Sequence, residues 1–129
     1  MSNVGLVTVV IRDYDEAIRF YVGALGFDLI EDTELGGGKR WVTVAPRGAR
    51  GASLLLARAD NDSQRARIGD QTGGRVFLFL YTDDIEADHD RMRAAGVTFV
   101  EPPRHDAYGT VAVFEDLYGN RWDLIQPSQ

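Results

Sequence analysis

Short runs of β-branched residues alternate along the chain with stretches of helical spacing. Residues 6–11 are almost entirely apolar and β-branched, which is typical of a buried strand. Apolar residues then recur every three or four positions over residues 17–25, which predicts a helix. Asp13 is placed to cap the start of this helix, and Gly26 is placed to end it in the left-handed conformation.

Three more strands are predicted in the first half, over residues 27–34, 41–45 and 53–57. Glycines 36–38 form a turn between the first two of these strands. Residues 59–74 are polar and contain glycine, which indicates a linker with one or two helical turns around residues 62–68.

The same order of elements returns after the linker. A strand is predicted over residues 76–82, then a helix that Asp84 caps and Gly96 ends. Strands follow over residues 97–101, 110–114 and 121–125, the last two joined by a turn from Asp116 to Asn120. The repeated order indicates two βαβββ modules, about residues 1–58 and 75–129, in a single α+β domain of 129 residues.

Composition excludes several function classes. The net charge is −6 and the sequence pI is near 4.8, so a nucleic-acid partner is not expected. The chain has no cysteine, which rules out disulfides and thiolate chemistry. It has two histidines. No apolar run is long enough to span a bilayer and no signal peptide is visible, so we expect a cytoplasmic protein without a membrane partner.

The helix caps and turns resemble those of the vicinal oxygen chelate superfamily, which holds glyoxalase I, extradiol dioxygenases, and fosfomycin-resistance and bleomycin-resistance proteins. The residues that carry the resemblance are Asp13, Phe20-Tyr21, Leu25-Gly26-Phe27, Asp83-Asp84, Gly96-Val97, Gly109-Thr110, Phe114, Asp116 and Gly119-Asn120. The resemblance implies two modules whose mixed sheet curls around a cleft, commonly in a homodimer. It leaves the chemistry open, because one fold hosts many functions.

The resemblance also implies where the metal enzymes of the superfamily hold their ligands. The matching positions here are Leu6, Leu55, Phe77 and Asp123. Only Asp123 carries a donor atom, and a divalent cation requires several oxygen or imidazole donors. We therefore expect no metal and no other cofactor.

Strand alternation predicts which side chains face the cleft. Val7, Val9 and Ile11 form the uniformly apolar side, expected under the helices. The opposite parity supplies aromatic rings, hydroxyls and one Arg/Asp pair, the usual composition of a small-molecule pocket. The predicted ligand-binding residues are Thr8, Trp41, Phe77, Phe79, Tyr81, Phe114, Arg121 and Asp123.

Each of these residues also has a plainer interpretation. The rings of Phe77, Phe79 and Tyr81 fit an ordinary core, and Trp41 fits a dimer interface. Asp123 and Arg121 fit an ion pair along one strand, in which the Arg fork orients an ionised carboxylate that points into the cleft. His89 lies on the apolar stripe of the second helix, where packing is the expected role.

Catalytic residues are not defined by any motif. The candidates are Asp123 or Glu115 as a base, with His105 or Tyr108 from the loop over residues 102–109 as an acid. We predict a metal-free protein that sequesters or transforms a small aromatic or cationic ligand. The alternatives are a metal-dependent lyase, isomerase or dioxygenase, and an interaction module whose cleft is filled by its own side chains.

Overall fold

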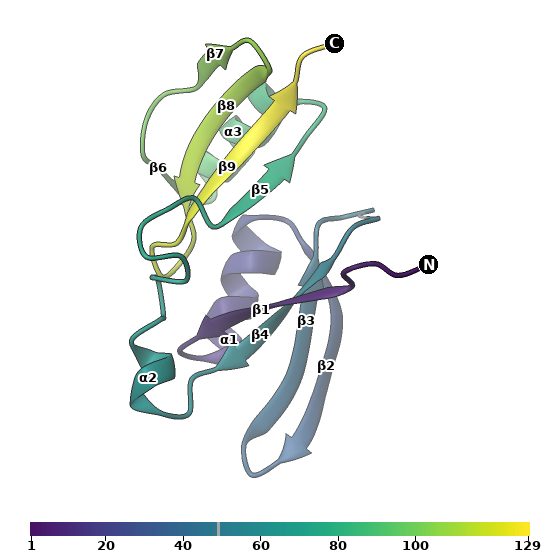
Figure 1. Cartoon of the computed structure of the whole chain (residues 1–129), viewed down its shortest axis with the longest axis vertical. Coiled ribbons are helices and arrows are strands. Elements are labelled where there is room, and N and C mark those ends of the chain that lie inside the picture. Colours follow the sequence, from purple (N-terminus) through teal and green to yellow (C-terminus); the bar gives the residue numbers. More distant parts are fainter. Residues whose placement is uncertain (49) are drawn as a thin grey trace. The chain divides into compact units, whose positions relative to one another are not determined.

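The computed structural model describes residues 1–48 and 50–129, which form two compact units, residues 1–68 and 69–129 (Figure 1). The first unit contains β1 (Leu6–Ile11), α1 (Tyr14–Ile18), β2 (Asp28–Gly36), β3 (Lys39–Ala45), β4 (Ser53–Arg58) and α2 (Asp62–Arg65). A π-helical segment, η1 (Arg19–Ala24), continues α1. The boundary between the units, after Ile68, falls inside the predicted linker.

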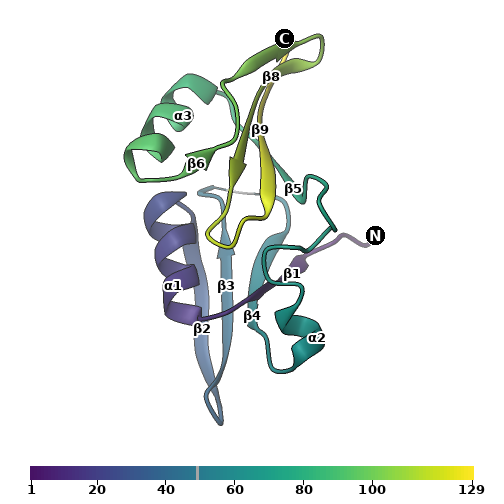
Figure 2. The same ribbon diagram turned by 90° about the vertical axis from the view of Figure 1, so that its left-hand side faces the viewer.

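The sheet of the first unit has the order β1-β4-β3-β2, with β1 parallel to β4 and the other pairs antiparallel. The helix covers one face of this sheet (Figure 2), where Val9, Ile11 and Tyr21 are fully buried. Asp13 accepts a hydrogen bond from the Glu16 amide at 2.9 Å, and Gly26 has a φ of 79°. Both predicted ends of this helix are therefore confirmed.

The other face of this sheet carries the predicted cleft residues. Thr8 lies opposite Leu55, and Leu55 lies opposite Thr43. Trp41 is two residues before Thr43 on β3 and therefore shares its face. The alternation predicted for these strands is confirmed. Thr8 and Trp41 are both exposed on this face.

The second unit contains β5 (Leu78–Tyr81), α3 (Ile85–Ala94), β6 (Thr98–Phe99), β7 (Arg104–Asp106), β8 (Gly109–Glu115) and β9 (Arg121–Pro127). Its sheet has the order β5-β9-β8-β6, and β7 also pairs with β8. In both units the first strand is parallel to the last, and the strand before the last also lies beside it. The predicted α+β fold with two mixed sheets is confirmed.

The strand β8 corrects one prediction. We expected Phe114 to share the face of Asp123, but Phe114 lies opposite Trp122, and the residue opposite Asp123 is Val113. Phe114 is fully buried and stacks on Trp122 with ring centroids 5.6 Å apart. Both sides of β8 are apolar, so alternation alone did not distinguish them.

The turn between β8 and β9 is built by residues that carried the family resemblance. The buried Asp116 carboxylate accepts hydrogen bonds from the amides of Tyr118 and Asn120 at 3.1 and 3.0 Å, and from the Asn120 side chain at 2.9 Å. Gly119 has a φ of 97°, which an L side chain rarely adopts. This turn sets the start of β9 and therefore the position of Asp123.

Within residues 1–48 and 50–129, no helix combines the length and the apolar character that crossing a membrane requires.

Candidate functional site

A hollow of about 420 Å³ lies on the second unit, beside β5 and β9. Phe114 and Trp122 lie on the helix side of the second sheet, because the Phe114 ring contacts Phe99, whose ring contacts His89 of α3. Asp123 follows Trp122 on β9 and therefore faces the other side. Strands β5 and β9 and the turn before β8 supply the lining. The lining residues are Phe79, Tyr81, Tyr108, Asp123, Ile125 and Pro127.

The walls of the hollow are aromatic rings that little else covers. The exposed fractions of Phe79, Tyr81 and Tyr108 are 54, 66 and 57%. Phe79 lies opposite Asp123 on the neighbouring strand, and Tyr81 lies opposite Ile125. Three large rings exposed around one depression are unusual for a core, because burying an aromatic side chain is strongly favourable.

Below the rings, the sheet forms an apolar floor. Val111, Val113 and Ile125 are buried and form one cluster on this face. Val113 lies opposite Asp123, so the carboxylate is set among these apolar side chains. The hollow therefore has aromatic walls, an apolar floor and one acidic group.

Asp123 is the buried polar group of this site. Its exposed fraction is 7%, and its Oδ1 atom has no hydrogen-bond partner in the described part of the chain. Burial raises the pKa of the Asp123 carboxyl; the Arg104 charge opposes this shift and the Glu101 charge adds to it. An unpartnered carboxylate oxygen at this depth is a vacant hydrogen-bond acceptor.

The expected fork between Arg121 and Asp123 is not formed. Arg121 is exposed, and no ion pair joins it to Asp123 among the residues described here. The cation that acts on Asp123 is Arg104 on β7, which is paired with Glu101 and with Asp106 at 3.0 Å. Because Arg104 already has two carboxylate partners, it is not free to neutralise Asp123.

The structure thus brings together four of the predicted residues, Phe79, Tyr81, Tyr108 and Asp123. Phe77 lies just before β5, and its ring meets the Trp122 ring edge-on at 6.4 Å. His105 lies opposite Thr110, 2.9 Å from its hydroxyl, on the other face of β8 from Asp123. Thr8 and Trp41 belong to the first unit.

Sequence reasoning missed the contribution of β7 and of the end of β9. Arg104 was not considered because residues 102–109 were predicted as a loop, and Glu101 was taken as the end of the predicted strand over residues 97–101. Pro127 lies beyond the predicted last strand. The two-residue connection Ala107-Tyr108 between β7 and β8 has none of the Asn-Gly or Asp-Gly pairs that signal a hairpin. The charged, three-residue β7 offered no other strand signal.

The residues at the superfamily's ligand positions do not fit a metal ion. Leu6, Leu55 and Phe77 have no donor atom, which leaves Asp123 alone. No group of three histidine, cysteine or acidic side chains in residues 1–48 and 50–129 is placed to hold a metal.

The family model of the Glyoxalase/Bleomycin resistance protein/Dioxygenase superfamily matches residues 3–124 of the chain. An uncharacterised protein of Shewanella frigidimarina (strain NCIMB 400) is 60% identical over 121 residues, which cover 93% of this chain and 90% of the relative.

Two crystal structures are similar along nearly the whole chain. UcmS2 has a TM-score of 0.84 and 32% identity, and the match covers 97% of this chain and 98% of that one. TnmS3, an antibiotic binding protein from Streptomyces sp. CB03234, has a TM-score of 0.79 and 36% identity, and the match covers 99% of this chain and 98% of that one.

Proposed function

The chain belongs to the glyoxalase/bleomycin resistance protein/dioxygenase superfamily, and from this membership we propose that it binds a small molecule at the hollow around Asp123. The ligand is flat and aromatic and donates a hydrogen bond to the Asp123 carboxylate. The protein acts by sequestering this molecule, without a resident metal.

The observation that carries the proposal is the buried, unpartnered Oδ1 atom of Asp123 among exposed aromatic rings. Leaving a buried acceptor without a partner costs about 1–3 kcal/mol, a cost that a ligand N–H or O–H would remove. A ligand with a cationic donor gains more, since hydrogen bonds to an ionised group are stronger than neutral ones.

Aromatic stacking supplies the remaining affinity. Phe79 and Tyr81 on β5 and Tyr108 before β8 present rings from two sides of the hollow. An aromatic contact of this kind is worth about 0.5–1.5 kcal/mol beyond the area it buries. The volume of about 420 Å³ lies in the usual range for a small-molecule pocket.

The similarity to TnmS3 supports binding rather than turnover, because that protein is described as an antibiotic binding protein.

The residues at the four ligand positions support the absence of a metal, since Asp123 is the one side chain among them that can bind a metal ion. We expect protein purified without chelator to contain less than about 0.1 divalent ion per chain by elemental analysis. A stoichiometric metal would contradict this part of the proposal and favour the lyase or dioxygenase alternative.

Two flat probes of opposite charge test the proposal in solution. Proflavine is a cation with amino donors, and anthraquinone-2-sulfonate is an anion with no donor. We expect proflavine to bind more tightly by at least about tenfold, measured by fluorescence titration, because one charge-assisted hydrogen bond is worth about 1.5–3 kcal/mol. Its affinity should rise with pH as Asp123 ionises.

The matched variants are Asp123→Asn and Asp83→Asn. Asp83 is an exposed aspartate outside the hollow, so its variant removes one charge without touching the site. Asp123→Asn should abolish both the preference for proflavine and the pH dependence, whereas Asp83→Asn should keep both. If both variants lost the preference for proflavine to the same extent, the preference would result from net charge, and the role of Asp123 would be refuted.

A further inference from the structure

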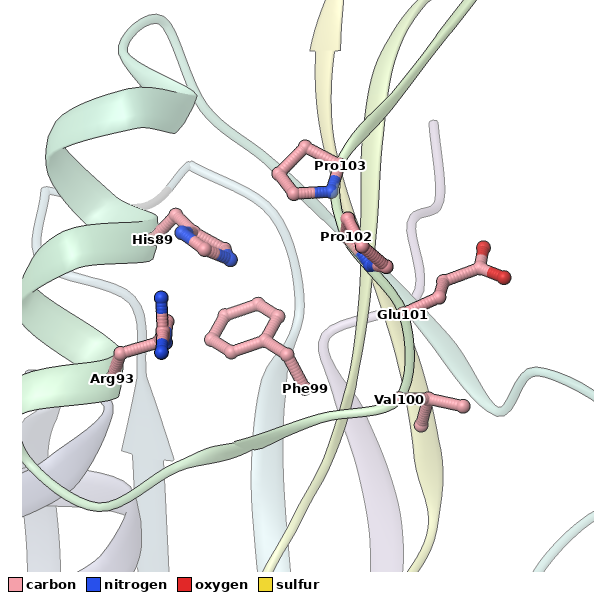
Figure 3. A pocket seen from close by; sticks show the side chains of 7 residues that line it. All are labelled: His89, Arg93, Phe99, Val100, Glu101, Pro102 and Pro103. Carbon is pink, nitrogen blue, oxygen red and sulfur yellow. The ribbon is translucent and has the colours of Figure 1, made fainter.

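A second hollow, of about 500 Å³, lies on the α3 side of the same unit. Its lining includes His89 and Arg93 of α3, Phe99 of β6 and the following Pro102 and Pro103 (Figure 3). We propose that this hollow is a binding site for a small aromatic carboxylate.

The two basic side chains lie on the same face of α3, because they are four residues apart. Figure 3 shows both pointing from the helix toward the ring of Phe99. The His89 side chain is 14% exposed, and its ring lies 4.3 Å from the Phe99 ring, centroid to centroid. Packing against Phe99 holds the imidazole at the wall of the hollow.

Arg93 has no carboxylate partner among the described residues, and its guanidinium lines the hollow. Arg91, two residues earlier on the same helix, pairs with Asp88 at 3.5 Å. The planar guanidinium of Arg93 offers two parallel N–H groups, the geometry that binds a carboxylate.

The acidic groups near this hollow are turned away from it or lie at its margin. Glu101 is one of the lining residues, but Figure 3 shows its side chain pointing away from His89 and Arg93, and it pairs with Arg104. Asp90 lies 4.0 Å from His89 Nδ1, and its side chain is 79% exposed. The side chains that point into the hollow are therefore basic or apolar, which favours an anion.

The apolar part of the lining determines which kind of group the anion carries besides its charge. Phe99 and the two prolines give a lining of rings with no hydrogen-bond donor, next to the two basic groups. A bare phosphate or sulfate would leave these rings uncovered. A flat ring that carries a carboxylate matches both parts of the lining. The ring packs on Phe99 and the prolines, and the carboxylate binds Arg93 and His89.

This site is separate from the one around Asp123. Phe99 lies opposite Phe114, whose ring is on the helix side of the sheet, whereas Asp123 faces the other side. The inference therefore stands or falls independently of the proposed function.

Benzoate is the probe, with benzyl alcohol as its neutral match. In a ¹H–¹⁵N spectrum of the full chain, we expect benzoate to shift the amides of His89, Arg93 and Phe99. We expect Arg93→Gln to weaken benzoate binding by at least about tenfold, since it removes the charged fork. Arg91→Gln removes a charge from the same helix outside the hollow and should leave the affinity unchanged within about twofold.

The proposal would be overturned by an absence of amide shifts at these residues at millimolar benzoate, or by shifts confined to the residues around Asp123. It would also be overturned if Arg93→Gln and Arg91→Gln lost benzoate affinity to the same extent. Benzyl alcohol binding as tightly as benzoate would also overturn it, because the hollow would then be selecting a ring and not an anion.

Discussion

Asp123 is the single residue on which the proposed site depends, and burial sets its protonation. Its pKa is raised above the ordinary value of 3.8, so the folded chain holds this proton more tightly than the unfolded chain does. The stability gained from the raised pKa is therefore fully present at pH values below 3.8, and it is lost as pH rises through the raised pKa. At neutral pH the ionised group is a cost to folding.

We predict that Asp123→Asn stabilises the chain at pH 7 by about 1 kcal/mol, because it removes an unpartnered buried charge. The gain should shrink as pH falls toward 4, where wild-type Asp123 becomes protonated. Urea unfolding of both proteins at the two pH values measures the difference, with Asp83→Asn as the exposed control. A variant less stable than wild type at pH 7 would mean that the carboxylate makes a stabilising contact.

Asp123 could be singled out from sequence because it occupies a ligand position of the superfamily and is the one acidic group there. Its environment could not be predicted in the same way. The adjacent Arg121 is the obvious partner along the strand, yet the charges that act on Asp123 come from Arg104 and Glu101, about twenty residues earlier in the chain. Long-range electrostatics of this kind depend on strand pairing, which composition does not reveal.

At the scale of elements, the turn before β9 holds the site in position. Asp116 is 5% exposed and satisfies two backbone amides and the Asn120 side chain. We predict that Asp116→Ala destabilises the chain by about 2–3 kcal/mol, because it leaves these buried donors without an acceptor. Chemical denaturation measures the loss, and Asp83→Ala should change stability by less than about 0.5 kcal/mol. Similar values for the two variants would refute the role of this turn.

Most elements were predictable because local signals agreed with the fold. Both helix starts were marked by a capping aspartate, and the Asp84 side chain accepts from the Ala87 amide at 3.1 Å as Asp13 does from Glu16. One exception is β7, which is short and charged. The other is β8, where both sides are apolar and the pattern does not show which side chains face the helix. In each case pairing with neighbours, rather than the local pattern, determines the structure.

At the scale of the whole molecule, the repeated βαβββ order was visible from the spacing of caps and turns. Exposed apolar residues remain on the first unit, where Leu29, Ile30 and Trp41 are 43, 58 and 37% exposed. In the part of the chain that the structure describes, strand β2 pairs with β3 alone and ends its sheet. Apolar groups on a sheet edge favour association with a second chain.

We therefore expect a homodimer, with a mass by light scattering of about twice the 14.3 kDa of one chain. Replacing Ile30 with Lys should shift the equilibrium toward the single chain if β2 lies in the contact, because it places a charge among these apolar groups. A wild-type mass of 14.3 kDa across the micromolar range would contradict this expectation.

The most direct test of the central claim is a crystal structure of the chain with proflavine bound. The account predicts the dye in the hollow of the second unit, with its plane against the rings of Phe79 and Tyr81. One of its amino nitrogens should lie within about 3 Å of Asp123 Oδ1, the distance of an N–H···O hydrogen bond. Proflavine seated elsewhere, or in the hollow with no contact to Asp123, would contradict it.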